Sequence, residues 1–180
     1  DFGIPKRETE GAVDAAYAAY DAYVQDVRQT GKAYIDYARA HGMPIIVVCG
    51  RPYHIDPEIN HGINDLITSF GFVLVTEDAL SYLEGYAPRH VLNQWTFQSR
   101  MYNAARYVCT QSDMEVVQLV SFGCGTDAIT TDEMRSILED GDKLYTQLKI
   151  DDISNLGAVK IRIRSLMAAM EARQAQDARG

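Results

Sequence analysis

One cysteine stands between two glycines, as Gly123, Cys124 and Gly125, where an apolar run ends and a helix is about to begin. Glycine gives the backbone unusual freedom and lets a bulky group approach the main chain closely. A helix start also lowers the pKa of a nearby thiol. Cys124 is therefore a candidate metal or cluster ligand, or a nucleophile. The alternative is a tight strand-to-helix turn with an inert thiol, and composition alone favours that alternative.

A second stretch whose residues could bind a ligand or take part in a reaction is "GRPYHIDPEINHG", residues 50–62. Arg51 could hold a phosphate or carboxylate group, and His54 could act as an acid, a base, a hydrogen-bond donor or a ligand. Alternatively, the two prolines build a rigid loop in which Tyr53 and His54 only pack. The two interpretations have equal weight, and the stretch has no glycine pattern for binding a nucleotide.

The stretch "TEDAL", residues 76–80, adds two acids after another apolar run. Glu77 and Asp78 could accept hydrogen bonds from neighbouring loops. They could equally be the acidic residues that favour the first turn of a short helix.

Hydrophobic periodicity predicts the elements that position these residues. A first helix is expected from Thr9 to His41, ended by Gly42 as its cap and by Pro44, and Gly31 either kinks or divides it. Short β-branched runs without polar alternation are typical of strands buried on both faces, and they predict strands at 44–50, 72–76, 114–121 and 143–150. Helical spacing predicts the remaining helices at 59–70, 91–108, 130–138 and 156–174.

Two of these helices rest on short motifs. Thr130 and Glu133 form a capping-box signature, which predicts a helix start at Thr130. The piece "VKIRIRS", residues 159–165, alternates like a strand, but the spacing of the apolar residues over 156–170 favours a helix.

Strands that alternate with helices predict a parallel sheet covered on both faces. We expect an α/β, three-layer, flavodoxin-like or Rossmann-like domain over residues 43–180, with about four strands in the order 2-1-3-4 and residues 1–42 as a helical segment packed on it. In such sheets ligands bind at the carboxyl ends of the strands, where the strand order reverses. The loops that follow strands 1 and 3 would then face one crevice.

Net charge and composition argue against some classes of binding partner. The chain has 180 residues and a net charge of −8, which argues against nucleic acid and anionic membranes as partners because both attract positive charge. No apolar run approaches the roughly 20 residues that span a bilayer. The three cysteines have no CxxC spacing, so a reducing cytoplasm is expected. The chain begins with Asp, and we expect it to be a piece of a larger protein.

Four stretches together resemble a known family: "GRPYHIDPEINHGI", "TEDAL", "SFGCGTDAITTDE" and "KIDDISNLGAVKIRIRSLMAAM". They are similar to the carboxyl-terminal part of CoA-substrate-specific enzyme activases, which are related to the 2-hydroxyacyl-CoA dehydratases and to the 2-hydroxyglutaryl-CoA dehydratase D-component. The similarity runs from about Pro44 to Met170.

This resemblance implies a domain of an iron–sulfur, ATP-dependent reductive enzyme of anaerobic metabolism that acts on CoA thioesters or similar small molecules. Cys124 would supply one ligand to a [4Fe-4S] cluster. The resemblance also implies cofactor-binding positions and residues of the adjoining catalytic site; these are Gly50, Ser121, Gly123 and Gly125 for the first group and Arg51, His54 and Glu77 for the second.

One thiol cannot hold such a cluster, which takes about four ligands. We therefore expect the remaining ligands and the ATP site to lie outside this chain, on upstream domains or a partner subunit, and the cluster to be absent from this chain alone. The chain would then be part of an enzyme and not a complete catalyst.

Two other hypotheses stay open. The domain could be a non-catalytic binder of a small anion, which would depend on Arg51 and not on Cys124. It could also be an interaction domain that uses the tyrosines of its first helix to dock onto the rest of its polypeptide or to form a homodimer.

Overall fold

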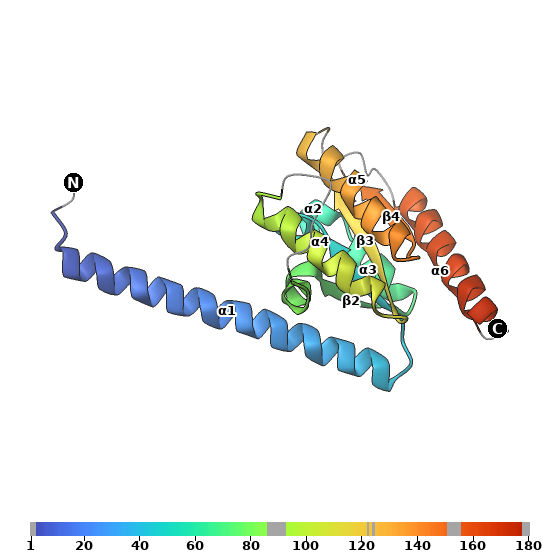
Figure 1. Cartoon of the computed structure of the whole chain (residues 1–180), viewed down its shortest axis with the longest axis horizontal. Helices are drawn as coiled ribbons and strands as arrows, with labels where there is room; N and C mark the ends of the chain where they lie inside the picture. The colour runs from blue at the N-terminus through green and yellow to red at the C-terminus, as the bar shows by residue number, and fades with distance from the viewer. Residues whose placement is uncertain (1–2, 86–92, 122, 124, 151–155, 178–180) are drawn as a thin grey trace.

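The core of the molecule is a four-stranded parallel sheet (Figure 1). The computed structural model describes residues 3–85, 93–121, 123, 125–150 and 156–177. The sheet has the order β2-β1-β3-β4, and its strands are β1 (Ile45–Cys49), β2 (Val73–Thr76), β3 (Met114–Val120) and β4 (Tyr145–Lys149). This confirms the predicted α/β class, the strand order and the long N-terminal helix.

The strands form where the sequence has unbroken apolar runs. All five residues of β1 and all seven of β3 are buried, as expected for central strands with helices on both faces. Ile45 lies opposite Val73 of β2 on one side and Met114 of β3 on the other. Since all strands run in the same direction, the chain leaves the sheet at Gly50, Glu77 and Ser121 on one common edge.

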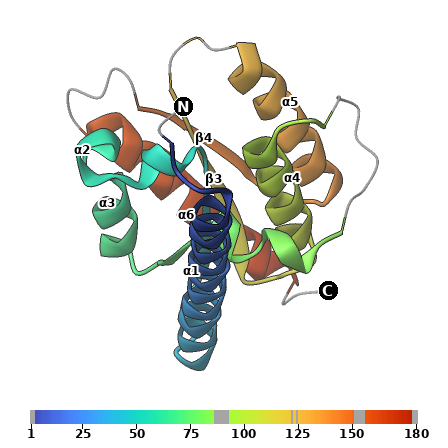
Figure 2. The same ribbon diagram turned by 90° about the vertical axis from the view of Figure 1, so that its left-hand side faces the viewer.

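Helices cover both faces of the sheet (Figure 2), and a cluster of apolar side chains lies between the sheet and the helices on each face. The helices α4 (Thr96–Cys109) and α5 (Gly125–Asp140) cover one face, while α3 (Ile63–Ser69) and α6 (Gly157–Asp177) cover the other. Short helical turns make up the connections on the carboxyl side of β1 and β2, namely η1 (Pro52–Ile55), α2 (Pro57–Asn60), η2 (Glu77–Ala79) and η3 (Ser81–Leu83).

The long helix α1 (Lys6–Ala40) is packed on the domain only through its second half. In Figure 1 its first half extends away from the other elements, and every residue from Lys6 to Tyr23 is exposed. The second half lies against β2 and η2, with Gly31, Ile35 and Ala38 buried. The four- and three-residue steps between these buried residues continue the stripe of apolar residues that runs along the first half of the helix.

The helix neither kinks nor divides at Gly31, because α1 is one unbroken helix. Gly31 is instead the point of closest approach to η2. A Cβ atom added there would overlap the side chain of Ala79. The lack of a side chain at Gly31 therefore lets α1 pack closely against η2 and does not end the helix.

The predicted helix at 59–70 is divided into α2 and α3, because His61 and Gly62 between them have left-handed backbone, and α4 and α5 also begin elsewhere than predicted. The prediction that α5 starts at Thr130 was wrong, because the helix already begins at Gly125. Thr130 is buried inside it, and its hydroxyl donates to the carbonyl of Thr126 at 2.7 Å instead of capping. The helix α4 begins at Thr96 because the backbone of Trp95 is extended.

The ambiguous piece at residues 159–165 is helical, as its longer spacing indicated. It belongs to α6, where Val159, Ile163 and Leu166 face the sheet and are buried. Three- and four-residue spacing places these side chains on one face of a helix, whereas local alternation alone would have placed them in a strand.

The docking of α1 gives a first prediction. We expect Gly31→Ala to destabilise the protein by roughly 1–3 kcal/mol, because overpacking forces helix and turn apart, and we expect Ala79→Gly to rescue it in the double variant. In the same helix a Cβ at Gly11 meets open space, so Gly11→Ala is the control and should raise helicity, since alanine favours helix by up to about 1 kcal/mol over glycine. Urea unfolding and circular dichroism measure both effects. Equal responses at the two glycines would contradict the docking.

Candidate functional site

A network of polar side chains joins the loops that follow β1 and β3. Arg51 Nη2 lies 2.7 Å from Asp127 Oδ1, and Arg51 Nη1 donates to Tyr53 Oη at 3.2 Å. The hydroxyl of Ser121 lies 3.2 Å from Tyr53 Oη and 3.1 Å from His54 Nε2. The two loops that the sequence analysis placed at one crevice therefore meet.

The turn η1 fixes His54 in this network. The amide of Arg51 donates to His54 Nδ1 at 3.1 Å, and since an amide can only donate, Nδ1 is the accepting nitrogen. The proton of the neutral ring is then on Nε2, where it points at Ser121. A Cβ added at Gly50 would lie 2.6 Å from His54 Nδ1, so glycine is required there to leave space for the ring.

Asp127 orients Arg51 from the first turn of α5. The carboxylate is 8% exposed, and its Oδ2 atom has no hydrogen-bond partner among the described residues. A helix start is a favourable place for a negative charge because the free backbone N–H groups point toward it. The charge of Asp127 thus holds a guanidinium at the edge of the sheet.

A cavity of about 470 Å³ opens next to this network, beneath α1. Its walls come from the middle of α1, from the loop after β1, from η2 and η3, and from the start of α4. Gly50, Arg51, His54 and Glu77 all line it. Four residues that the sequence analysis singled out therefore share one cavity.

Glu77 is the buried acid of the cavity. Its Oε1 atom lies 2.8 Å from Arg100 Nη2, and the residue is 5% exposed. Burial raises the pKa of Glu77 from 4.5 to about 7, although Arg100 opposes this change, and the nearby Asp78 adds to it. Glu77 can therefore bind or release a proton near neutral pH.

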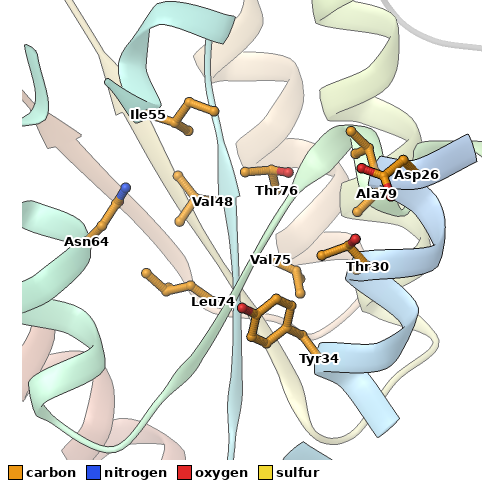
Figure 3. Close-up of a pocket in the computed structure, with 12 residues that line it drawn as sticks. Asp26, Thr30, Tyr34, Val48, Ile55, Asn64, Leu74, Val75, Thr76 and Ala79 are labelled. Carbon is orange, nitrogen blue, oxygen red and sulfur yellow. The ribbon is translucent and has the colours of Figure 1, made fainter. Parts of the chain in front are cut away.

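A second, more apolar groove of about 270 Å³ continues from the cavity along β2 (Figure 3). It lies between α1 and α3, with Tyr34 on one side and Asn64 on the other. Groove and cavity have four lining residues in common, which are Val27, Val48, Ile55 and Thr76. The charged cavity and the apolar groove thus form one cleft.

Cys124 lies outside the described residues, but the glycines on either side of it are described. A Cβ added at Gly123 or at Gly125 would meet no atom of the described residues within 4 Å. The assignment of these residues to a cofactor stays a prediction.

The other two cysteines do not fit a cluster ligand set with Cys124. Cys49 is fully buried in the core, and burial raises its pKa far above the ordinary value. Cys109 ends α4, donates to the carbonyl of Ile137 at 3.4 Å, and also has a pKa raised by burial. No group of three potential metal ligands occurs among the described residues.

Sequence reasoning missed three residues of the site. Asp127 was not singled out in the helix-start motif, and Arg100 was hidden among the aromatic residues of α4. Arg28 carries the clearest overlooked signal, because it places a charge within the stripe of α1 that contains Val24 and Gly31. A charged residue on a packed face has to find a polar partner or a cavity.

Residues 1–80 match a family model described as CoA enzyme activase uncharacterised domain. The predicted resemblance to CoA enzyme activases is confirmed. The matched region of the activase-type domain holds α1, β1 and β2 and thus Arg28, Arg51, His54 and Glu77. The sequence motifs span about Pro44 to Met170, whereas the match covers residues 1–80, so it adds α1 and does not include the motifs after residue 80. No curated protein matches the chain.

None of the helices in the described part of the chain has both the length and the apolar character to cross a bilayer.

The raised pKa of Glu77 gives a second prediction. The folded protein keeps a proton on Glu77 that the unfolded chain releases above pH 4.5, so this residue makes stability fall as pH rises from 4.5 to about 7. The groups around it are Arg100 on α4, Asp78 on η2 and Cys49 on β1. The cost of ionising Glu77 in the folded state is about 3 kcal/mol above pH 7.

Glu77→Gln should remove this pH dependence. Urea unfolding at pH 5 and pH 8 should show the variant gaining stability relative to the wild type by up to about 3 kcal/mol at the higher pH. Glu139→Gln, at an exposed acid of α5, is the control and should show no such change. A Glu77→Gln difference that is the same at both pH values would mean that Glu77 ionises like an exposed acid.

Proposed function

We propose that this chain is one domain of an iron–sulfur, ATP-dependent activase or dehydratase-like enzyme that acts on CoA thioesters or similar small molecules. The family match of residues 1–80 supports the activase part of this proposal. The main support from geometry is that Arg51, His54 and Glu77 line one cavity at the carboxyl edge of the sheet, where α/β proteins bind ligands. The reaction, the substrate and a cytoplasmic location are parts of the proposal.

Each polar residue of the cavity has a role in this proposal. Arg51, oriented by Asp127 at 2.7 Å, binds a carbonyl or carboxylate oxygen of the substrate through its guanidinium. His54 is held by the Arg51 amide and by Ser121 and positions the substrate by hydrogen bonding. Glu77, with a pKa of about 7, takes up or gives a proton near neutral pH.

Cys124 is proposed as one ligand of a [4Fe-4S] cluster. Such a cluster transfers single electrons, at potentials that its surroundings set. The glycines on either side of Cys124 support this role, because glycine lets a bulky group approach the backbone closely. The other ligands and the ATP site are assigned to upstream domains or to a partner subunit, since Cys49 and Cys109 are packed elsewhere.

A second candidate function is an interaction domain, and the exposed first half of α1 favours it. Val13, Tyr17 and Tyr20 are exposed on this half and follow three- and four-residue spacing. Such a stripe is suited to packing against another helix or a second copy of the chain. This role is compatible with the first, because a domain of a larger enzyme has to dock.

The cluster role is tested by measuring iron and acid-labile sulfide in the polypeptide that naturally contains this chain, purified without oxygen. We expect about four of each per cluster in the wild type and the loss of most of both in Cys124→Ala. Cys109→Ala is the matched control and should keep the full content, since Cys109 packs beside Gly141 at the opposite edge of the sheet, where β3 and β4 begin.

Two results would overturn the cluster role. One is a wild-type polypeptide free of iron and sulfide, and the other is full retention of both in Cys124→Ala. Cys124 would then be a turn residue. Equal losses in both cysteine variants, together with a lower unfolding temperature, would indicate general destabilisation, and the ligand role of Cys124 would likewise fail.

A further inference from the structure

The side chains that line the cavity beneath α1 include a cluster of positive charges. Three arginines line it, from α1, from the turn after β1 and from α4, namely Arg28, Arg51 and Arg100. Among the described residues, the carboxyl groups that line it are Glu77 and Asp78, and Asp127 lies next to it as the partner of Arg51. In a chain with a net charge of −8, a cavity with excess positive charge attracts anions.

The three arginines differ in their partners. Arg51 is paired with Asp127, and Arg100 is paired with Glu77. Arg28 has no hydrogen bond or ion pair with any described residue, and it stacks on the ring of Tyr82 with 4.3 Å between its Cζ atom and the ring centroid. Stacking fixes the plane of a guanidinium while leaving its edge open to an acceptor.

Two of these side chains also have an unsatisfied donor. The Nε atoms of Arg28 and Arg100 are buried and have no acceptor among the described residues. A buried N–H group without an acceptor is unfavourable and is rare in native proteins. Both residues belong to the same cavity, so one ligand could provide acceptors to the two guanidinium groups.

We propose that Arg28 and Arg100 form a binding site for the oxyanion of a small ligand, a carboxylate or a phosphate. The guanidinium group binds both kinds of oxyanion through two parallel hydrogen bonds. The apolar groove along β2 adjoins the site and shares Val27 and Ile55 with it. A ligand with an oxyanion at one end and an apolar chain at the other fits both parts of the cleft.

Packing holds Arg28 in position. It lies one turn before Gly31, where α1 makes its close contact with η2, and next to Val27, which packs against the core. From the exposed first half of α1, Tyr20 and Tyr23 also line the cavity, next to this packed segment. The oxyanion site also goes beyond the proposed cluster role, since it requires neither Cys124 nor a second domain.

The test is calorimetric titration of the 180-residue chain with three probes at pH 7 and low salt. Hexanoate carries a carboxylate and an apolar chain, inorganic phosphate carries only an oxyanion, and 1-hexanol carries only the apolar chain. We expect hexanoate to bind more tightly than 1-hexanol, and added salt to weaken its binding because the attraction is between charges. Tighter binding of phosphate than of hexanoate would identify a phosphoryl group as the natural oxyanion.

Variants assign the binding to the two arginines. Arg28→Gln should weaken binding of the anionic probes at least tenfold, and Arg28→Lys should weaken it less because the charge remains. Arg164→Gln is the matched control, since Arg164 also lies over an aromatic ring, that of Phe70, on the other face of the sheet. It should leave the affinity unchanged. Thermal unfolding of each variant verifies its fold.

The role of Arg100 needs a paired variant because Glu77 would lose its partner. Arg100→Gln combined with Glu77→Gln keeps the local charge balance and should lose anion binding, whereas Glu77→Gln alone should retain it. The proposal is overturned if neither hexanoate nor phosphate binds, or if a folded Arg28→Gln variant binds both as tightly as the wild type. Neither result bears on the iron content, so failure here is distinct from failure of the cluster role.

Discussion

The close contact between Gly31 of α1 and Ala79 of η2 is the constraint on which the site depends. Because no side chain separates them, the helix can pass over the edge of the sheet at β2 and cover the carboxyl ends of β1 and β2. One turn earlier the same helix carries Arg28 into the wall of the cavity. A larger residue at either position would lift the helix, and the cavity would lose that wall.

The sheet contributes the other half of the arrangement. Its parallel strands bring the ends of β1, β2 and β3 to one edge, and the turn η1 then folds His54 back over Gly50. Arg51 connects the two parts of the site, because it pairs with Asp127 beside β3 and also lines the cavity beside β2. Catalytic and binding groups that depend on each other for position are expected to tolerate little substitution.

The sequence allowed the sheet to be predicted because its signals are local. The short β-branched apolar run of β1 favours a strand buried on both faces, and its alternation with helices favours a parallel sheet. The start of α5 could not be predicted in the same way. Its first turn contains Gly125 and Thr126, which have low helix propensity, and Asp127 of the same turn is held by its long-range contact with Arg51.

The cavity residues show a different limit of sequence reasoning. Arg51, His54 and Glu77 stood out because they directly follow strands, and the structure places them together. Arg28 and Arg100 lie inside helices, Arg28 as a charge within a packed stripe and Arg100 among aromatic residues, and only the tertiary arrangement brings them to the same cavity.

The central claim is that α1 docks through its second half and thereby completes the cleft. Hydrogen exchange of the backbone amides along α1 tests this claim most directly, because exchange reports local opening. The account predicts strong protection from about Val27 to Ala40, where the helix meets β2 and η2, and rapid exchange before Tyr20. Uniformly rapid exchange along the whole helix would contradict the account, because Arg28 would then have no fixed place in the cavity.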